Sequence, residues 1–106
     1  MKLYIAGKIT GNKSYKAEFD NAAKQAEAQG FTVLNPAALP RGMTKQEYMR
    51  ICFAMIDTAD TVLMLPNCWD SSGAKLEEAY ADYTGKGLIY AGGTSWFDME
   101  EWGAHK

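Results

Sequence analysis

The chain has 106 residues, 47% of them hydrophobic and 23% charged, a balance typical of one globular domain rather than a disordered segment. Eleven basic and thirteen acidic residues give a net charge of -2 without a Lys/Arg cluster, so a nucleic-acid polymer is not an expected partner. No apolar run approaches the roughly 20 residues of a membrane span, and Gly7 interrupts the start before a signal-peptide core could form. We therefore expect a cytoplasmic protein that makes no membrane contact and binds a small molecule.

Histidine and cysteine limit the chemistry further. The only histidine, His105, lies close to the end of the given chain, which argues against Ser-His-Asp and Cys-His nucleophile systems and removes the commonest zinc ligand. Cys52 and Cys68 lack metal-ligand spacing, and we expect both to be free thiols. Neither a metal nor a cofactor is expected, so any acid-base or covalent chemistry falls to carboxylates, tyrosines or lysines.

The first half of the chain begins with an apolar run over residues 3–6, which predicts a strand, and a loop over 7–13. Ser14 is the expected cap of a helix that ends at Gly30 in the left-handed conformation. A second strand is predicted over residues 31–34, followed by a proline-containing loop over 35–42. The residues expected on the buried stripe of the first helix are Tyr15, Phe19, Ala22, Ala23 and Ala26.

A second helix is predicted from Thr44, with Glu47 completing a capping box, to about Asp57. The apolar run over 61–65 is typical of a central strand covered on both faces. The residues that we expect the second helix to bury are Tyr48, Ile51, Cys52, Met55 and Ala59.

The last part of the chain contains a loop over 66–73, a third helix that Gly85 and Gly87 end, and a fourth strand over 88–91. We assign to the third helix a buried stripe of Leu76, Ala79, Tyr80 and Tyr83. The tail from Gly92 carries Trp96, Phe97, Met99 and Trp102, which would cover the last strand or form an interface between subunits. We favour a homodimer or a higher homo-oligomer.

The alternation of predicted strands and helices along the chain predicts an α/β fold. We expect one flavodoxin-like (Rossmann-like) domain over residues 1–106, with 92–106 as an accessory tail. The sheet would be mainly parallel, with four to five strands and helices on both faces. A strand order of 2-1-3-4 would place a ligand beyond the carboxyl ends of strands one and three. The loops 7–13 and 66–73 would border that site.

Both loops contain residues that permit close approach of a polar ligand. Gly7 and Gly11 lie in the first loop, and Asp70-Ser71-Ser72-Gly73 opens the third helix. Free N–H groups at a helix N-terminus, together with the hydroxyls of Ser71 and Ser72, could hold a phosphate beside Gly73. The same residues also form an ordinary N-cap sequence, which is the simpler interpretation.

Glu77 lies about one turn into the third helix, on the side away from Leu76 and beside the small residues Gly73, Ala74 and Ala81. These neighbours leave space for its carboxylate to point into the predicted cleft. Most helical glutamates are solvated instead, as we expect for Glu78.

Three stretches resemble the nucleoside 2-deoxyribosyltransferase-like superfamily: residues 3–11 (LYIAGKITG), Asp60 before the third strand, and residues 71–79 (SSGAKLEEA). The superfamily pattern is Tyr-hydrophobic-Ala-Gly-Pro at the first strand and Gly-small-x-x-Glu-x-x-x-Ala at the third helix. The chain is most similar to the DUF4406 branch, and the likeness covers about residues 2–91. The residues that match this branch are Asn35-Pro36-Ala37, Tyr48-Met49 and Met64-Leu65-Pro66-Asn67-Cys68-Trp69-Asp70-Ser71-Ser72-Gly73-Ala74.

The resemblance implies that Glu77 is a nucleophile that attacks the anomeric carbon of a deoxyribosyl group, with Tyr4 as its orienting partner. A glycosyl-enzyme ester would form, to be resolved by water or by a second base. At the position of Ser71, nucleoside transferases have an aspartate and the 2'-deoxynucleoside 5'-monophosphate N-hydrolases a serine. A neutral donor does not repel phosphate, so Ser71 favours the monophosphate. Lys8 replaces the proline of the pattern and is a candidate phosphate-binding cation.

One departure concerns Cys52, because characterised members have at this position an aspartate that helps to protonate the leaving base or to orient the nucleophile. Asp57 and Asp60 are expected at the opposite edge of the sheet, which leaves Asp70 as the better substitute acid. The alternative to an enzyme is a catalytically inactive nucleotide-binding protein. A third hypothesis is an interaction module without a ligand, based on the aromatic tail. The superfamily often completes its site with residues from a neighbouring subunit.

Overall fold

In the computed structural model, which describes residues 1–91, four parallel strands form one sheet in the order β2-β1-β3-β4. The predicted fold class and strand order are therefore confirmed. The residues of the aromatic tail, on which the predicted contact was placed, lie outside the described part. The elements are β1 (Lys2–Ala6), α1 (Tyr15–Ala28), β2 (Thr32–Leu34), the 3-10 helix η1 (Pro36–Ala38), α2 (Lys45–Thr58), β3 (Thr61–Met64), the 3-10 helix η2 (Cys68–Asp70), α3 (Ser72–Tyr83) and β4 (Gly87–Tyr90).

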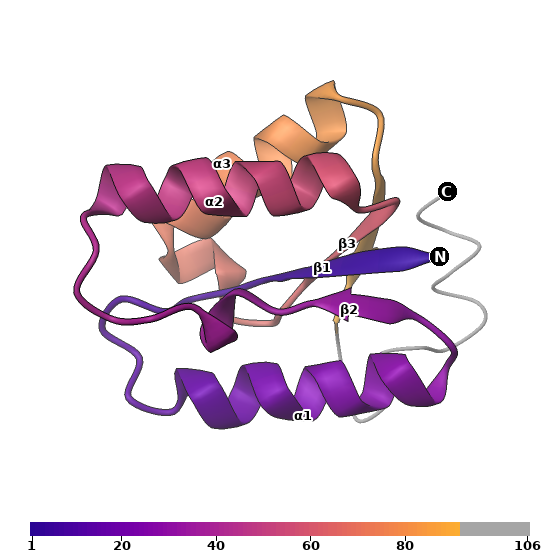
Figure 1. The fold of residues 1–106 in the computed structure, drawn as a ribbon, viewed down its shortest axis with the longest axis horizontal. Coiled ribbons are helices and arrows are strands. Elements are labelled where there is room, and N and C mark those ends of the chain that lie inside the picture. The colour runs from indigo at the N-terminus through magenta and orange to yellow at the C-terminus, as the bar shows by residue number, and fades with distance from the viewer. Residues whose placement is uncertain (92–106) are drawn as a thin grey trace.

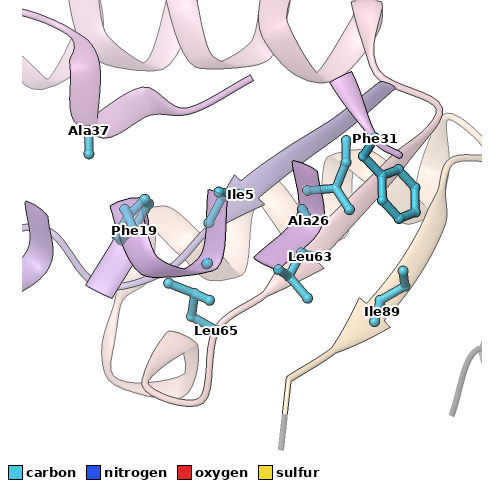
Figure 2. Packing of buried hydrophobic residues seen from close by; sticks show 10 residues of the cluster. Ile5, Phe19, Ala26, Phe31, Ala37, Leu63, Leu65 and Ile89 are labelled. Atoms are coloured by element: carbon cyan, nitrogen blue, oxygen red, sulfur yellow. The ribbon is translucent and has the colours of Figure 1, made fainter. Parts of the chain in front are cut away.

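The sheet has a different helical layer on each face, with α1 on one side and both α2 and α3 on the other (Figure 1). Because successive strand residues point to opposite faces, Leu3 and Ile5 pack toward α1, whereas Tyr4 packs toward α2 and α3. On the α1 side, Phe19 contributes its ring to a cluster that includes Leu63 of the central strand (Figure 2). Each face thus has its own core.

Most of the predicted helix starts and ends are confirmed. Thr44 and Glu47 form the capping box at the start of α2, and Gly30 follows α1 with a φ of 92°. The prediction for Ser14 was wrong in its mechanism, since its side chain makes no capping hydrogen bond and its backbone N–H donates to Asn12 Oδ1. The Asn12 side chain, rather than that of Ser14, thus stabilises the turn before the helix, as Asx side chains commonly do. No helix within residues 1–91 is both long and apolar enough to cross a membrane.

The buried stripe predicted for α3 is wrong. The helix turns Ala74, Glu77 and Ala81 toward the sheet, while Leu76 is 56% exposed and Tyr83 91% exposed. Small inner side chains let α3 pack close to the sheet, and the larger residues consequently point outward. Ala79 is exposed and Tyr80 only half-buried.

On α2, the prediction that Ile51 is buried is also wrong, because its side chain is 37% exposed. Cys52 is buried as predicted, and Ile56, which was not predicted, is the other buried residue of the helix. Tyr48 and Met55 are half-buried, and Ala59 is buried just after the helix ends.

Gly7 directly follows β1 at a close approach between α1 and the turn after β3. A Cβ atom at this position would lie 3.1 Å from Leu65 Cβ and 3.2 Å from Phe19 Cζ. Both neighbours belong to the core on the α1 side, so neither can move freely. Glycine is required here by packing.

We predict that Gly7→Ala lowers the free energy of unfolding by about 1 to 2 kcal/mol through overpacking. Gly73→Ala is the matched control, because the nearest atom to its Cβ would be Met49 Cε at an ordinary 3.6 Å. Alanine also favours the helix, and the control should be neutral or stabilising by up to about 1 kcal/mol. Urea denaturation measures both values, and equal effects of the two substitutions would contradict this account.

Candidate active site

A hydrogen bond between Tyr4 and Glu77 lies at the centre of the α2 and α3 side of the sheet. The Tyr4 hydroxyl donates to Glu77 Oε2 over 2.8 Å, although the two residues are 73 positions apart in the chain. Tyr4 is fully buried, and Glu77 is only 7% exposed. The parallel sheet explains the contact: Tyr4 lies opposite Val62 on β3, and α3 packs across both strands.

Cys52 from α2 is the third polar member of this cluster. Its side chain is buried, and the thiol hydrogen-bonds with the Tyr4 hydroxyl and the Glu77 carboxylate. Three different elements, β1, α2 and α3, therefore supply the three groups. Apolar side chains such as Ile56 and Met64 surround them, which excludes water from most of the cluster.

Burial dominates the electrostatics of this cluster. It raises the pKa of the Glu77 carboxyl from 4.5 to about 7, while the hydrogen bonds from Tyr4 and Cys52 act in the opposite direction. Burial likewise raises the pKa of the Cys52 thiol to about 11. The pKa of Tyr4 is raised well above 10, first by burial and then by the nearby Glu77 charge. Near neutral pH, therefore, Glu77 titrates between two groups that remain protonated donors.

Ser71 is the N-cap of α3, and its Oγ accepts a hydrogen bond from the Ala74 backbone N–H over 3.1 Å. The interpretation of residues 70–73 as an N-cap sequence is therefore confirmed. A hydroxyl that accepts one hydrogen bond can still donate its proton, so the group stays able to bind an anion. Ser72 is exposed and Gly73 half-buried, one turn before Glu77.

The first loop is tied to the loop after β3 by a polar network that sequence reasoning missed. The Lys8 backbone N–H donates to Asn67 Oδ1, and Asn67 Nδ2 donates to Glu18 Oε1. Asn12 Nδ2 donates to the same Glu18 oxygen and to the Lys8 carbonyl. Only the presence of Asn on both loops could have indicated this network. It fixes the two loops that border the predicted site.

The remaining predicted residues lie at the same carboxyl edge but outside the polar cluster. Gly11 has a φ of 78°, and the Lys8 side chain is half-buried. Asp70 is exposed at the end of η2, and within residues 1–91 it makes no hydrogen bond to Glu77. A pocket of about 280 Å³ beside Glu18 and Pro66 lies on the α1 side of the sheet, and Glu77 does not line it.

Asp60 lies at the opposite edge, where it accepts a hydrogen bond from the Lys2 backbone N–H over 2.8 Å. That contact and the Lys2 ammonium at 3.5 Å keep the pKa of Asp60 below its ordinary value. Asp60 therefore lies at the amino edge of the sheet, as predicted. Asp60 therefore joins β1 to the turn before β3.

Comparison with known proteins places the chain in a family. Residues 1–90 match the family described as "Domain of unknown function (DUF4406)", and the chain belongs to that family. No curated protein matches it.

Among solved structures, the chain is similar to a 2-deoxyribosyltransferase from Bacillus psychrosaccharolyticus, with a TM-score of 0.73, 17% identity, and coverage of 94% of this chain and 90% of that one. It is similar to a 2-desoxiribosyltransferase from Leishmania mexicana, with a TM-score of 0.68, 19% identity and coverage of 85% of this chain; it spans 63% of that protein's length. The CMP N-glycosidase BcmB from Clostridium botulinum gives a TM-score of 0.66 at 19% identity, covering 86% of this chain and 71% of that one. The fold is therefore the deoxyribosyltransferase-like fold that the sequence resemblance predicted.

The raised pKa of Glu77 predicts a pH-dependent stability. Between pH 4.5 and about 7 the native state binds more protons than the unfolded chain, so stability should fall as the pH rises through this window. The total loss should be about 3 kcal/mol, and the curve should level off above it. Glu77→Gln should remove this slope and make the protein more stable than the wild type at pH 8.

Denaturation at several pH values measures this effect. The control is Glu27→Gln on the exposed surface of α1, which should leave the slope intact. Identical pH dependences for the wild type and Glu77→Gln would contradict the prediction.

Proposed function

We propose that this protein cleaves or exchanges the N-glycosidic bond of a 2'-deoxynucleoside or its 5'-monophosphate, with Glu77 as the nucleophile. The observation that carries the proposal is the buried Glu77 carboxyl, held by the Tyr4 hydroxyl at 2.8 Å, one turn inside a helix that starts at the carboxyl edge. Proteins of the same fold include deoxyribosyltransferases and an N-glycosidase. The cytoplasm is the location we propose for this activity.

In the proposed reaction, a Glu77 oxygen attacks C1' of the sugar as the bond between C1' and the base nitrogen breaks. The bonding electrons leave with the base, which takes up a proton, and a glycosyl ester of Glu77 results. Water would then release the sugar, or a second base would accept it. Tyr4 would act by fixing one carboxylate oxygen so that the other faces the sugar.

Burial of Glu77 supports this role and also sets a requirement. A carboxylate in an apolar surrounding is poorly solvated, which makes it a stronger nucleophile than one in water. The sugar must approach along the first turn of α3, where Gly73 has no side chain to block the path to Glu77. Ser71, Ser72 and Lys8 would then hold the 5'-hydroxyl or phosphate.

The leaving base needs a proton, and the supply of that proton is where this chain is least equipped. The Cys52 thiol has a pKa of about 11, so it is a weak acid near neutral pH. Asp70 is exposed at the same edge, and we propose that its carboxylate passes a proton from solvent to the leaving base. Protonation by solvent is the other route, and it would favour substrates whose base leaves easily.

A nucleotide-binding protein without turnover is the second candidate function, favoured by Cys52 beside Glu77. Such a protein would keep the phosphate site at Ser71–Gly73 but would not need an ionised Glu77. Calorimetry distinguishes the two: a binder should hold a deoxynucleoside monophosphate without product formation, and with the same affinity in Glu77→Gln.

For the enzyme, we predict base release from at least one member of a panel of deoxynucleosides and 5'-monophosphates, assayed with and without a second free base. Glu77→Ala should reduce the rate by at least about a thousandfold, because the covalent step is lost. Glu27→Ala should keep the wild-type rate. Chromatography of the products measures this, and release no faster than in Glu77→Ala would overturn the proposal.

The rate of base release should rise with pH and reach half of its maximum near pH 7, because only the ionised Glu77 attacks. Tyr4→Phe should lower the rate by about tenfold to a hundredfold and shift this midpoint to higher pH, since it removes a hydrogen bond to the ionised form. Tyr83→Phe, at an exposed position, is the control. An unchanged midpoint in Tyr4→Phe would show that Tyr4 does not position Glu77.

A further inference from the structure

Trp69 is an exposed aromatic residue at the carboxyl edge of the sheet, and the proposed reaction does not use it. It lies in η2, between the end of β3 and the start of α3, and its side chain is 56% exposed. Within residues 1–91, the other exposed large apolar side chains belong to Met1 or to the helices α2 and α3. Trp69 is therefore the one large apolar side chain in that range that a loop at the carboxyl edge presents to solvent.

The Trp69 ring is held in place from one side. It stacks on the ring of Tyr90 at the end of β4, with the ring centres 6.1 Å apart and the planes within 8°. The Tyr90 hydroxyl donates a hydrogen bond to Glu78 Oε2, which fixes the supporting ring at its far end. The backbone of η2 is fixed as well, since the Ser71 N–H donates to the Cys68 carbonyl over 3.1 Å. A ligand that stacks on Trp69 would meet an ordered ring, so little conformational entropy would be lost on binding.

The surroundings of the Trp69 ring indicate which ligand it would accept. In the described part of the chain no second ring contacts Trp69, and its remaining surface is open to a planar molecule. The exposed Asp70 follows directly in the chain, and the Glu78 carboxylate lies against Tyr90. Negative charge beside an indole ring favours a planar ligand that has amino groups or takes up a proton. A nucleobase that leaves a sugar has this chemistry.

Trp69 lies on the same side of the sheet as Glu77 and shortly before the same helix. Tyr90, on which Trp69 stacks, packs against the core that contains Tyr4, the hydrogen-bond partner of Glu77. Gly73, past which the sugar is proposed to approach, is four residues after Trp69, so their Cα atoms are at most about 14 Å apart. In a deoxynucleoside the base is bonded to C1', the atom that Glu77 would attack. An indole side chain and a base that point toward each other together span a comparable distance.

We propose that Trp69 binds the nucleobase of the substrate by stacking its indole ring on the base, with Tyr90 supporting the ring from behind. The inference rests on the proposed function and adds the contact that holds the base. Stacking does not depend on the hydrogen-bonding pattern of a base, so Trp69 would accept all four bases and would bind the larger purines more tightly than the pyrimidines. It would also bring the leaving base beside Asp70.

Calorimetry in the Glu77→Gln background tests the proposal, because binding can then be measured without turnover. The probes are the four deoxynucleosides, their 5'-monophosphates and deoxyribose 5-phosphate, which lacks a base. Trp69→Ala should weaken binding of the tightest base-containing probe by about tenfold to a hundredfold and leave that of deoxyribose 5-phosphate unchanged. Trp69→Phe, which keeps a ring, should stay within about threefold of the parent. Leu76→Ala, which truncates an equally exposed side chain of α3, should change neither affinity.

Tryptophan fluorescence gives a result even if Trp69→Ala fails to fold, which circular dichroism would show. Binding of the base should quench part of the emission, and this part should be absent from Trp69→Phe. Quenching that persists in Trp69→Phe would contradict the stack.

Three further results would overturn the proposal: no binding of any base-containing probe, unchanged affinity in Trp69→Ala, or an equal loss of affinity for deoxyribose 5-phosphate. The last of these would show that Trp69 acts on the loop rather than on the base. Failure of the proposed function looks different, because the wild type would then release no base while binding would still depend on Trp69.

Discussion

The structure depends most on the requirement that a carboxyl group, Glu77, be buried against the sheet. A buried carboxyl needs hydrogen-bond donors, and Tyr4 supplies one from the neighbouring strand at 2.8 Å. To bring Glu77 this close, α3 must turn its small residues inward, Ala74 and Ala81 among them. The larger apolar side chains of the helix are consequently exposed to solvent. The hydrogen bond of the candidate active site is thus linked to the exposure of Leu76 and Tyr83 on the opposite side of the same helix.

The two faces of the sheet accordingly serve different purposes. On the α1 side, Phe19, Leu63 and their neighbours form an apolar core that holds the loop after β1 at a close approach around Gly7. On the α2 and α3 side, the cluster of Tyr4, Cys52 and Glu77 occupies space within the apolar core. Burial of Glu77 lowers the stability of the fold, and this loss grows as Glu77 ionises. Retaining an ionisable group in a core at such a cost is typical of functional sites, where local stability is lower than the sequence could provide.

Much of this arrangement could be predicted from the sequence, and the failures have physical reasons. Strand positions and order follow from short apolar runs and parallel crossovers, and the α2 capping box from Thr44 and Glu47. The orientation of α3 could not be predicted from hydrophobic periodicity, because Leu76 and Tyr83 form a more apolar stripe than the face that is actually buried. Packing distance to the sheet, a tertiary property, decides between the two faces. The position of Cys52 beside Glu77 depends on packing in the same way, because it joins α2 to α3, whereas hydrophobic periodicity indicates only that Cys52 is buried.

The central claim is that Glu77 forms a covalent bond with the sugar. Mass spectrometry of the intact protein, quenched soon after mixing with a substrate that it cleaves, tests this claim most directly. The account predicts an increase in mass equal to one deoxyribosyl group, located by peptide mapping on Glu77 and absent from Glu77→Gln. Base release with no adduct at any time point, or an adduct on a different residue, would contradict it.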